Sequence, residues 1–177
     1  RIPGRAQPLD RQKTQLGHQA MSAVDRQMMS RALQLAAKGR YTSAPNPSVG
    51  CVIARDDSII GEGFTRPAGG NHGEIEALQQ ASDTAGATAY VTLEPCSHQG
   101  RTGPCADALV AAGISRVVIA CEDPNPEVAG SGIQKLKDAG IEVELGLMED
   151  QARESNRGFI KRHEQGMPWV TVKMAAS

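Results

Sequence analysis

YVTLEPC, at residues 90–96, carries a short apolar segment straight into a Pro-Cys pair. The apolar run followed by proline predicts a buried β-strand that ends just before the cysteine. A second Pro-Cys pair, Pro104-Cys105, follows, and eight residues separate Cys96 from Cys105. Because proline suits the first helical position, a helix is expected over residues 104–112. The stretch therefore predicts a strand, a loop and a helix, with a cysteine at each end of the loop.

Upstream of this unit lies His72-Gly73-Glu74, at the start of a helix expected over residues 74–82. One imidazole and two thiols, those of Cys96 and Cys105, make three zinc ligands and leave a tetrahedral ion one open position for water. The Glu74 carboxylate could move protons to and from that water. A closed structural site would need a fourth ligand and no glutamate. Singly, His72 and Glu74 would be ordinary surface residues, but together with the cysteines they favour a catalytic zinc site.

Strand and helix patterns alternate along the rest of the chain. A capping-box pattern at Ser22 begins a helix that ends near Gly39, and residues 49–54 and 59–64 read as a hairpin. Further strands are expected over 90–93, 116–120, 141–145 and 169–174, and further helices over 132–139 and 149–164. A hairpin followed by alternating strands and helices predicts a three-layer α/β/α sandwich with a mixed central sheet.

The composition is that of a globular domain with a tail. Of 177 residues, 40% are apolar and 22% charged, and the net charge is −1, which gives no general attraction to nucleic acid or to a membrane surface. Aromatic residues make up 3%, too few for a base-stacking platform. Residues 1–21 lack the apolar centre of a signal peptide and are expected to be a disordered extension. The folded domain is expected over 22–166.

The four cysteines divide into two kinds. Cys51 and Cys121 lie in apolar strand-like runs and are expected to be small buried residues, whereas Cys96 and Cys105 lie in polar surroundings that suit metal ligands. Two disulfides are the alternative, but a domain of this length does not need them. A reducing cytoplasmic location is therefore expected.

The loop between the two ligand cysteines, residues 97–104, is rich in groups that bind phosphate. It carries one arginine, one histidine, two hydroxyls and two glycines that let backbone N–H groups approach a ligand. A merely exposed polar loop is the alternative. The composition favours a phosphorylated small-molecule substrate.

These motifs together resemble a known family. The H-x-E and P-C elements are typical of zinc-dependent base deaminases, although polynucleotide and cytidine deaminases place only two residues between their cysteines. From about Asp25 onward the chain resembles the deaminase domain of the bifunctional riboflavin-biosynthesis deaminase–reductase, through residues 44–52, 72–74, 92–105 and 123–126. The resemblance implies a cytidine-deaminase-like fold. It also implies hydrolysis of the 2-amino group of 2,5-diamino-6-ribosylamino-4(3H)-pyrimidinone 5′-phosphate, which yields 5-amino-6-(5-phosphoribosylamino)uracil and releases ammonia.

The same resemblance implies a role for each matching residue. One Zn²⁺ would be held by His72, Cys96 and Cys105, and Glu74 would carry protons. Asn46 would hydrogen-bond the pyrimidine, and His98 and Arg101 would hold its ring or phosphate end. Residues 167–177 resemble the opening strand of the reductase domain, so NADP would bind only in that second domain and not in this one.

Two positions depart from the family pattern. Gly73 stands where alanine is usual, and Thr65 stands where the family commonly has a histidine, seven residues before His72. Glycine at position 73 costs about 1 kcal/mol of helix stability relative to alanine but leaves the ligands intact. The Thr65 hydroxyl can still hydrogen-bond a substrate, but it is shorter than histidine and cannot be cationic.

Two other functions remain open. The first is a different zinc deaminase, acting on a nucleoside, a free base or a tRNA adenosine; the long loop and the neutral charge disfavour tRNA. The second is a zinc-stabilised domain without catalysis that serves binding or assembly, for which Glu74 would not be required. The expected partners are the phosphorylated pyrimidine and the reductase domain, without nucleic acid or membrane, and a homo-oligomer stays open.

Overall fold

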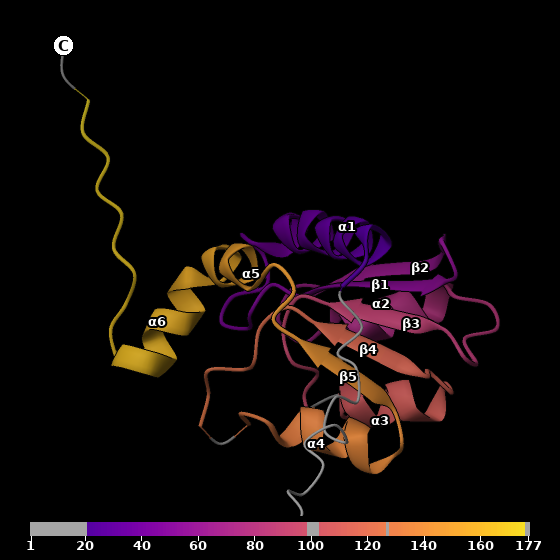
Figure 1. The fold of residues 1–177 in the computed structure, drawn as a ribbon. Helices are drawn as coiled ribbons and strands as arrows, with labels where there is room; N and C mark the ends of the chain where they lie inside the picture. The colour runs from indigo at the N-terminus through magenta and orange to yellow at the C-terminus, as the bar shows by residue number, and fades with distance from the viewer. Residues whose placement is uncertain (1–20, 99–102, 127, 176–177) are drawn as a thin grey trace, which may run out of the picture.

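A single five-stranded sheet organises the chain (Figure 1). The structure is a computed structural model, which describes residues 21–98, 103–126 and 128–175. The strands lie in the order β2-β1-β3-β4-β5. Strand β1 is antiparallel to both β2 and β3, whereas β3, β4 and β5 run parallel. Their bounds are β1 (Gly50–Arg55), β2 (Ser58–Phe64), β3 (Thr88–Val91), β4 (Arg116–Ile119) and β5 (Glu142–Leu145).

Helices cover both faces of this sheet. Figure 1 shows α1 (Ala23–Gly39) and α5 (Glu149–Ser155) on one side, with α2 (Gly73–Gln80), α3 (Cys105–Ala111) and α4 (Ser131–Asp138) on the other. Helix α6 (Arg157–Gln165) extends beyond the sheet. The predicted three-layer sandwich with a mixed sheet is confirmed. Within the described residues, no helix has the length and apolar character needed to cross a membrane.

Helix α1 begins where the capping-box pattern predicts. The Ser22 hydroxyl accepts a hydrogen bond from the Asp25 amide at 3.0 Å, and the Asp25 carboxylate accepts one from the Ser22 amide at 2.7 Å. Two otherwise unpaired N–H groups at the helix start are thereby satisfied. The apolar side chains that recur at helical spacing pack into the core: Met28, Met29, Ala32, Leu35 and Ala36.

Helix α2 lies very close to strand β2. A side-chain Cβ at Gly61 would come within 2.3 Å of the Ala77 carbonyl oxygen, and one at Gly63 within 2.2 Å of the Gly73 carbonyl oxygen. Only glycine allows this approach. The contact fixes the N-terminus of α2, and with it the His72-Gly73-Glu74 motif, against the sheet.

Two predicted elements differ from the structure. The single helix expected over 149–164 is wrong, because α5 and α6 are separated at Asn156. The Asn156 side chain hydrogen-bonds the backbone of Ser48, which lies just before β1. Its Oδ1 accepts from the Ser48 amide at 2.8 Å and its Nδ2 donates to the Ser48 carbonyl at 3.0 Å. The strand expected over 169–174 is also wrong, because this segment pairs with no strand of the described sheet.

Candidate active site

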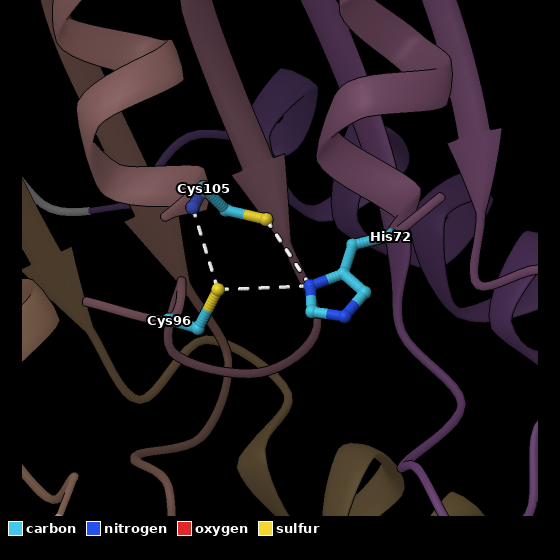
Figure 2. A group of neighbouring side chains, drawn as sticks. All are labelled: His72, Cys96 and Cys105. Carbon is cyan, nitrogen blue, oxygen red and sulfur yellow. Dashed lines mark hydrogen bonds between the residues drawn. The ribbon is translucent and has the colours of Figure 1, made fainter. Parts of the chain in front are cut away.

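The three predicted metal ligands come together from three separate elements. His72 immediately precedes α2, Cys96 lies in the loop after β3, and Cys105 is the first residue of α3. Figure 2 shows the His72 Nδ1 atom facing both sulfurs, at 3.6 Å from Cys96 Sγ and 3.3 Å from Cys105 Sγ. All three ligand atoms lie within 4.8 Å of one another.

These separations fit a tetrahedral zinc ion. With Zn–S near 2.3 Å and Zn–N near 2.0–2.1 Å, a tetrahedral ion holds its nitrogen and sulfur ligands about 3.5 Å apart. One imidazole and two thiols are also donors that zinc prefers. The donor set and its spacing therefore suit Zn²⁺ with one position left for water.

The local backbone holds the two cysteines in this arrangement. The Cys105 amide donates to Cys96 Sγ at 3.3 Å, and the Ala106 amide donates to the Cys96 carbonyl at 3.1 Å. The start of α3 is thus bonded directly to the loop that carries the first cysteine. An N–H group that donates to sulfur stabilises the thiolate form.

His72 and Glu74 can serve the same site although they are two residues apart. His72 has extended backbone angles (φ −75°, ψ 161°) and lies outside the helix, so the helical periodicity does not separate it from Glu74. The Glu74 side chain is buried, and its Oε2 atom has no hydrogen-bond partner within the described residues. A buried carboxylate oxygen without a partner is costly unless a ligand or water satisfies it.

The buried site shifts the titration of its groups. Burial, with the nearby Cys96 as a second cause, raises the pKa of Glu74 to about 7. A hydrogen bond from the Cys105 thiol, together with His72, lowers the pKa of Cys96 to about 4. The neighbouring Cys96 and burial raise the pKa of the Cys105 thiol. A carboxyl with a pKa near neutrality can both take up and release a proton.

A cavity of about 200 Å³ opens beside the ligand cluster. Three predicted substrate contacts, Asn46, Thr65 and His98, lie in its wall, and the fourth, Arg101, falls outside the described residues. The full lining consists of Asn46, Pro47, Val49, Thr65, His72, Glu74, Leu93, Glu94, Cys96, His98, Asp123, Asn125, Val128, Phe159 and His163.

The Thr65 hydroxyl is engaged by the protein itself. It accepts a hydrogen bond from the Val49 amide at 3.0 Å and donates to the Val49 carbonyl at 3.3 Å. Its donor is thus committed, and the side chain is almost fully buried. A contact between Thr65 and the substrate stays a prediction, restricted to a remaining acceptor position.

Sequence reasoning missed Glu94 as a structural support of the site. Its buried carboxylate accepts four backbone N–H groups: those of Asp123, Gly130, Gly132 and Ile133, at 3.2, 3.0, 2.8 and 3.1 Å. Two of these belong to the first turn of α4 and two to the loop that lines the cavity. The position of Glu94 between a buried strand and Pro95-Cys96 was the available signal.

The remaining cysteines are structural. Cys51 and Cys121 are buried, as predicted, and all four cysteines are free. The alternative of two disulfides is excluded in this structure. Burial raises the pKa of both buried thiols, which keeps them protonated.

The fold and the three-ligand site together define a zinc-dependent deaminase domain of the cytidine deaminase type. Residues 22–121 match the family model of the cytidine and deoxycytidylate deaminase zinc-binding region, more than half of the chain.

The narrower family follows from individual relatives. The chain is 48% identical over 145 residues to the diaminohydroxyphosphoribosylamino-pyrimidine deaminase of Buchnera aphidicola subsp. Schizaphis graminum, which covers 81% of this chain and 99% of that protein. It is 55% identical over 154 residues to the riboflavin biosynthesis protein RibD of Escherichia coli, which covers 86% of this chain and 42% of that protein. The chain belongs to the diaminohydroxyphosphoribosylamino-pyrimidine deaminase family.

A solved structure agrees in fold. RibD of Acinetobacter baumannii, form 1, is 57% identical and superposes with a TM-score of 0.80, covering 82% of this chain and 41% of that chain. The present chain thus spans about two fifths of the length of the RibD proteins it matches.

Proposed function

We propose that the chain catalyses the hydrolytic deamination of 2,5-diamino-6-ribosylamino-4(3H)-pyrimidinone 5′-phosphate to 5-amino-6-(5-phosphoribosylamino)uracil and ammonia. The observation that carries the proposal is the buried Oε2 of Glu74, which has no hydrogen-bond partner among the described residues and lies beside three atoms spaced as zinc ligands. The substrate is supported by relatives whose names state this pyrimidine, one of them matched over nearly its whole length.

The residues divide the work between metal binding and proton transfer. When bound by His72, Cys96 and Cys105, zinc supplies a Lewis acid that lowers the pKa of water. Glu74 takes the two protons of the attacking water in turn and delivers the first to the ring nitrogen and the second to the leaving amine. A carbon–oxygen bond forms at the amino-bearing carbon and its bond to the amino nitrogen breaks. Water is consumed and ammonia is released, without any redox change.

The cavity wall would orient the pyrimidine. Asn46 can both donate and accept hydrogen bonds, which matches the mixed donors and acceptors of a pyrimidine edge. His98 lies at the exposed rim of the same cavity and would hold the ring or phosphate end, with Arg101 as its predicted companion.

We further propose a second domain beyond this one. In this proposal residues 22–166 form the deaminase domain, residues 1–21 precede it as an extension, and residues 167–177 begin a reductase domain that binds NADP. The support is twofold: the matched RibD proteins are more than twice as long, and Val170, Val172 and Met174 are 70%, 76% and 88% exposed. All four cysteines are free thiols, which supports a cytoplasmic location for the reaction.

The direct test measures zinc content and ammonia release on the same preparation. The phosphorylated diaminopyrimidine is the substrate, and cytidine is the control for a different zinc deaminase. We expect one zinc per chain and ammonia release from the phosphorylated pyrimidine alone. Bound zinc without turnover of that compound would refute the proposal and leave the non-catalytic binding domain as the better account.

A further inference from the structure

Helix α6 contributes a histidine to the cavity that no motif marks. His163 lies 91 residues after His72, yet both line the same cavity. The His163 ring packs against Phe159 of the same helix, with ring centroids 4.6 Å apart and planes tilted by 53°. This contact restricts the orientation of the His163 ring at the cavity wall.

The rest of the described lining offers few groups that could hold an anion. None of the described lining residues is Lys or Arg, and His98 and His163 are the only imidazoles besides the metal-facing His72. Val49 and Leu93 are apolar, and the Thr65 hydroxyl already donates to Val49. Besides the amides of Asn46 and Asn125, an anionic part of a ligand would find side-chain donors at His98 and His163, and not at Thr65.

A carboxylate, that of Asp123, lines the same cavity as His98 and His163. Burial raises the pKa of Asp123, and the hydrogen bond from the Asn125 amide counteracts that rise. One oxygen of Asp123 accepts the Asn125 amide at 2.8 Å, which fixes the carboxylate within its own loop. An imidazole N–H group can donate a hydrogen bond to a phosphate oxygen.

From this arrangement we infer that His163 is a further substrate-binding residue, which receives the phosphorylated end of the substrate together with His98. The inference rests on the proposed function, because it takes the pyrimidine to lie at the zinc site. With the ring held beside Glu74 and Asn46, the ribosyl phosphate extends along the cavity toward α6. His163 thereby selects the phosphorylated over the dephosphorylated pyrimidine.

The test compares the phosphorylated substrate with the same compound after removal of its phosphate. In H163L the leucine keeps an apolar contact with Phe159 but has no N–H group, whereas H163Q restores one donor. The matched control is K161L, on the same helix, since Lys161 does not line this cavity. Removing a hydrogen bond to a charged group is expected to raise KM about tenfold.

We expect H163L to raise KM for the phosphorylated substrate by that factor, with kcat within about twofold, and to leave KM for the dephosphorylated compound unchanged. H163Q should recover most of the affinity, and K161L should behave as the wild type. Equal loss for both compounds, or no loss for either, would overturn the inference.

A binding measurement separates this result from the fate of the proposed function. Calorimetric titration of both compounds into E74Q protein, with and without H163L, reports phosphate selectivity without turnover. A selectivity lost in H163L supports the inference even if wild-type protein releases no ammonia, which would count against the proposed reaction alone. Absence of selectivity in E74Q overturns the inference even if the wild type is active.

Discussion

At the scale of single residues, Glu74 is where proton transfer can be separated from metal binding. E74Q preserves the size of the side chain but removes the carboxyl group that we propose takes up and releases protons. We expect one zinc per chain to remain and kcat to fall by about 10²–10⁴-fold, the usual contribution of general acid–base catalysis. Zinc is measured by elemental analysis and the rate by ammonia release.

The matched control for this variant is E76Q, two residues further along the same helix. Glu76 bonds to Arg66 and Asn71 and does not line the cavity. Its replacement should leave both zinc and kcat near wild-type values. A near-normal rate in E74Q would remove Glu74 from the mechanism, and loss of zinc in E74Q would mean that the carboxylate supports the metal instead.

Gly73 and Thr65, the two departures from the family pattern, both lie against Val49. A Cβ at Gly73 would lie 2.7 Å from the Val49 carbonyl oxygen and 3.3 Å from the Phe64 Cα, while Thr65 bonds both the amide and the carbonyl of Val49. The glycine therefore has a packing reason that helix propensity does not reveal. We infer that the hydrogen bonds of Thr65 hold the Val49 carbonyl in the space that a side chain at position 73 would occupy.

This contact predicts the sign of a substitution. Alanine at position 73 should gain about 1 kcal/mol of helix propensity but lose more through overpacking, which costs about 1–3 kcal/mol. G73A should thus lower the free energy of unfolding by about 1 kcal/mol. G158A is the control, because a Cβ there meets only the Trp169 Cβ, at 3.7 Å. An unchanged or raised stability of G73A would contradict the packing argument.

The double variant T65V/G73A tests the coupling itself. Removing the hydroxyl frees the Val49 amide and leaves the Val49 carbonyl bonded to the amide of residue 65, at 2.9 Å, which should still let Val49 shift away from the new methyl group. The combined loss should then be smaller than the sum of the single losses by at least about 0.5 kcal/mol, measured by urea unfolding. Strict additivity would show that the two positions act independently.

At the scale of elements, Glu94 links α4 and the cavity loop by hydrogen bonds to the segment between β3 and Cys96. E94Q keeps the shape but replaces one acceptor oxygen by a donor amide, which faces backbone N–H groups. We expect a loss of about 3 kcal/mol in unfolding free energy, in the range for hydrogen bonds to buried charge. E122Q, at an exposed glutamate nearby, should change stability little. Equal stability of E94Q and wild type would show that the loop and α4 are held by other contacts.

The elements also show how far the sequence could predict this fold. The sheet, the sandwich and the ligand set followed from local signals: apolar runs, the capping box at Ser22 and the Pro-Cys pairs. The break at Asn156 did not, because it depends on Ser48, 108 residues away in the chain. The strand over 169–174 was expected from the sequence, but a strand also needs a hydrogen-bonding partner, which a local sequence does not supply.

The cavity wall illustrates the same limit. Asn46, Thr65 and His98 could be assigned to it through the family resemblance, and the structure brings all three to the cavity. His163 and Phe159 could not be assigned, because α6 carries no motif and reaches the site only through tertiary packing. That Thr65 bonds Val49 is likewise invisible in the sequence.

At the scale of the whole molecule, a buried network joins α1 to the parallel half of the sheet. The Asp25 carboxylate accepts from the Tyr90 hydroxyl and the Arg116 guanidinium, each at 2.8 Å, and Arg116 also donates to Glu144 at 2.6 Å. Burial acts to raise the pKa of Asp25, but the hydrogen bonds from Arg116, Ser22 and Tyr90 outweigh it and hold this pKa well below its ordinary value. One carboxylate thus links α1, β3, β4 and, through Arg116, β5.

This network predicts how stability depends on pH. Because the folded-state pKa of Asp25 is depressed, its contribution is complete above the unfolded-state pKa of about 3.9 and is lost as pH falls from there toward the folded-state value. D25N should therefore lower the free energy of unfolding at pH 7 by about 2–3 kcal/mol. The difference from wild type should shrink in urea titrations as the pH falls below about 4. D83N, which removes an exposed carboxylate paired with Arg55, is the matched control and should unfold as the wild type does at either pH. A D25N deficit that stays constant down to pH 3 would assign the loss to packing rather than to the ionised carboxylate.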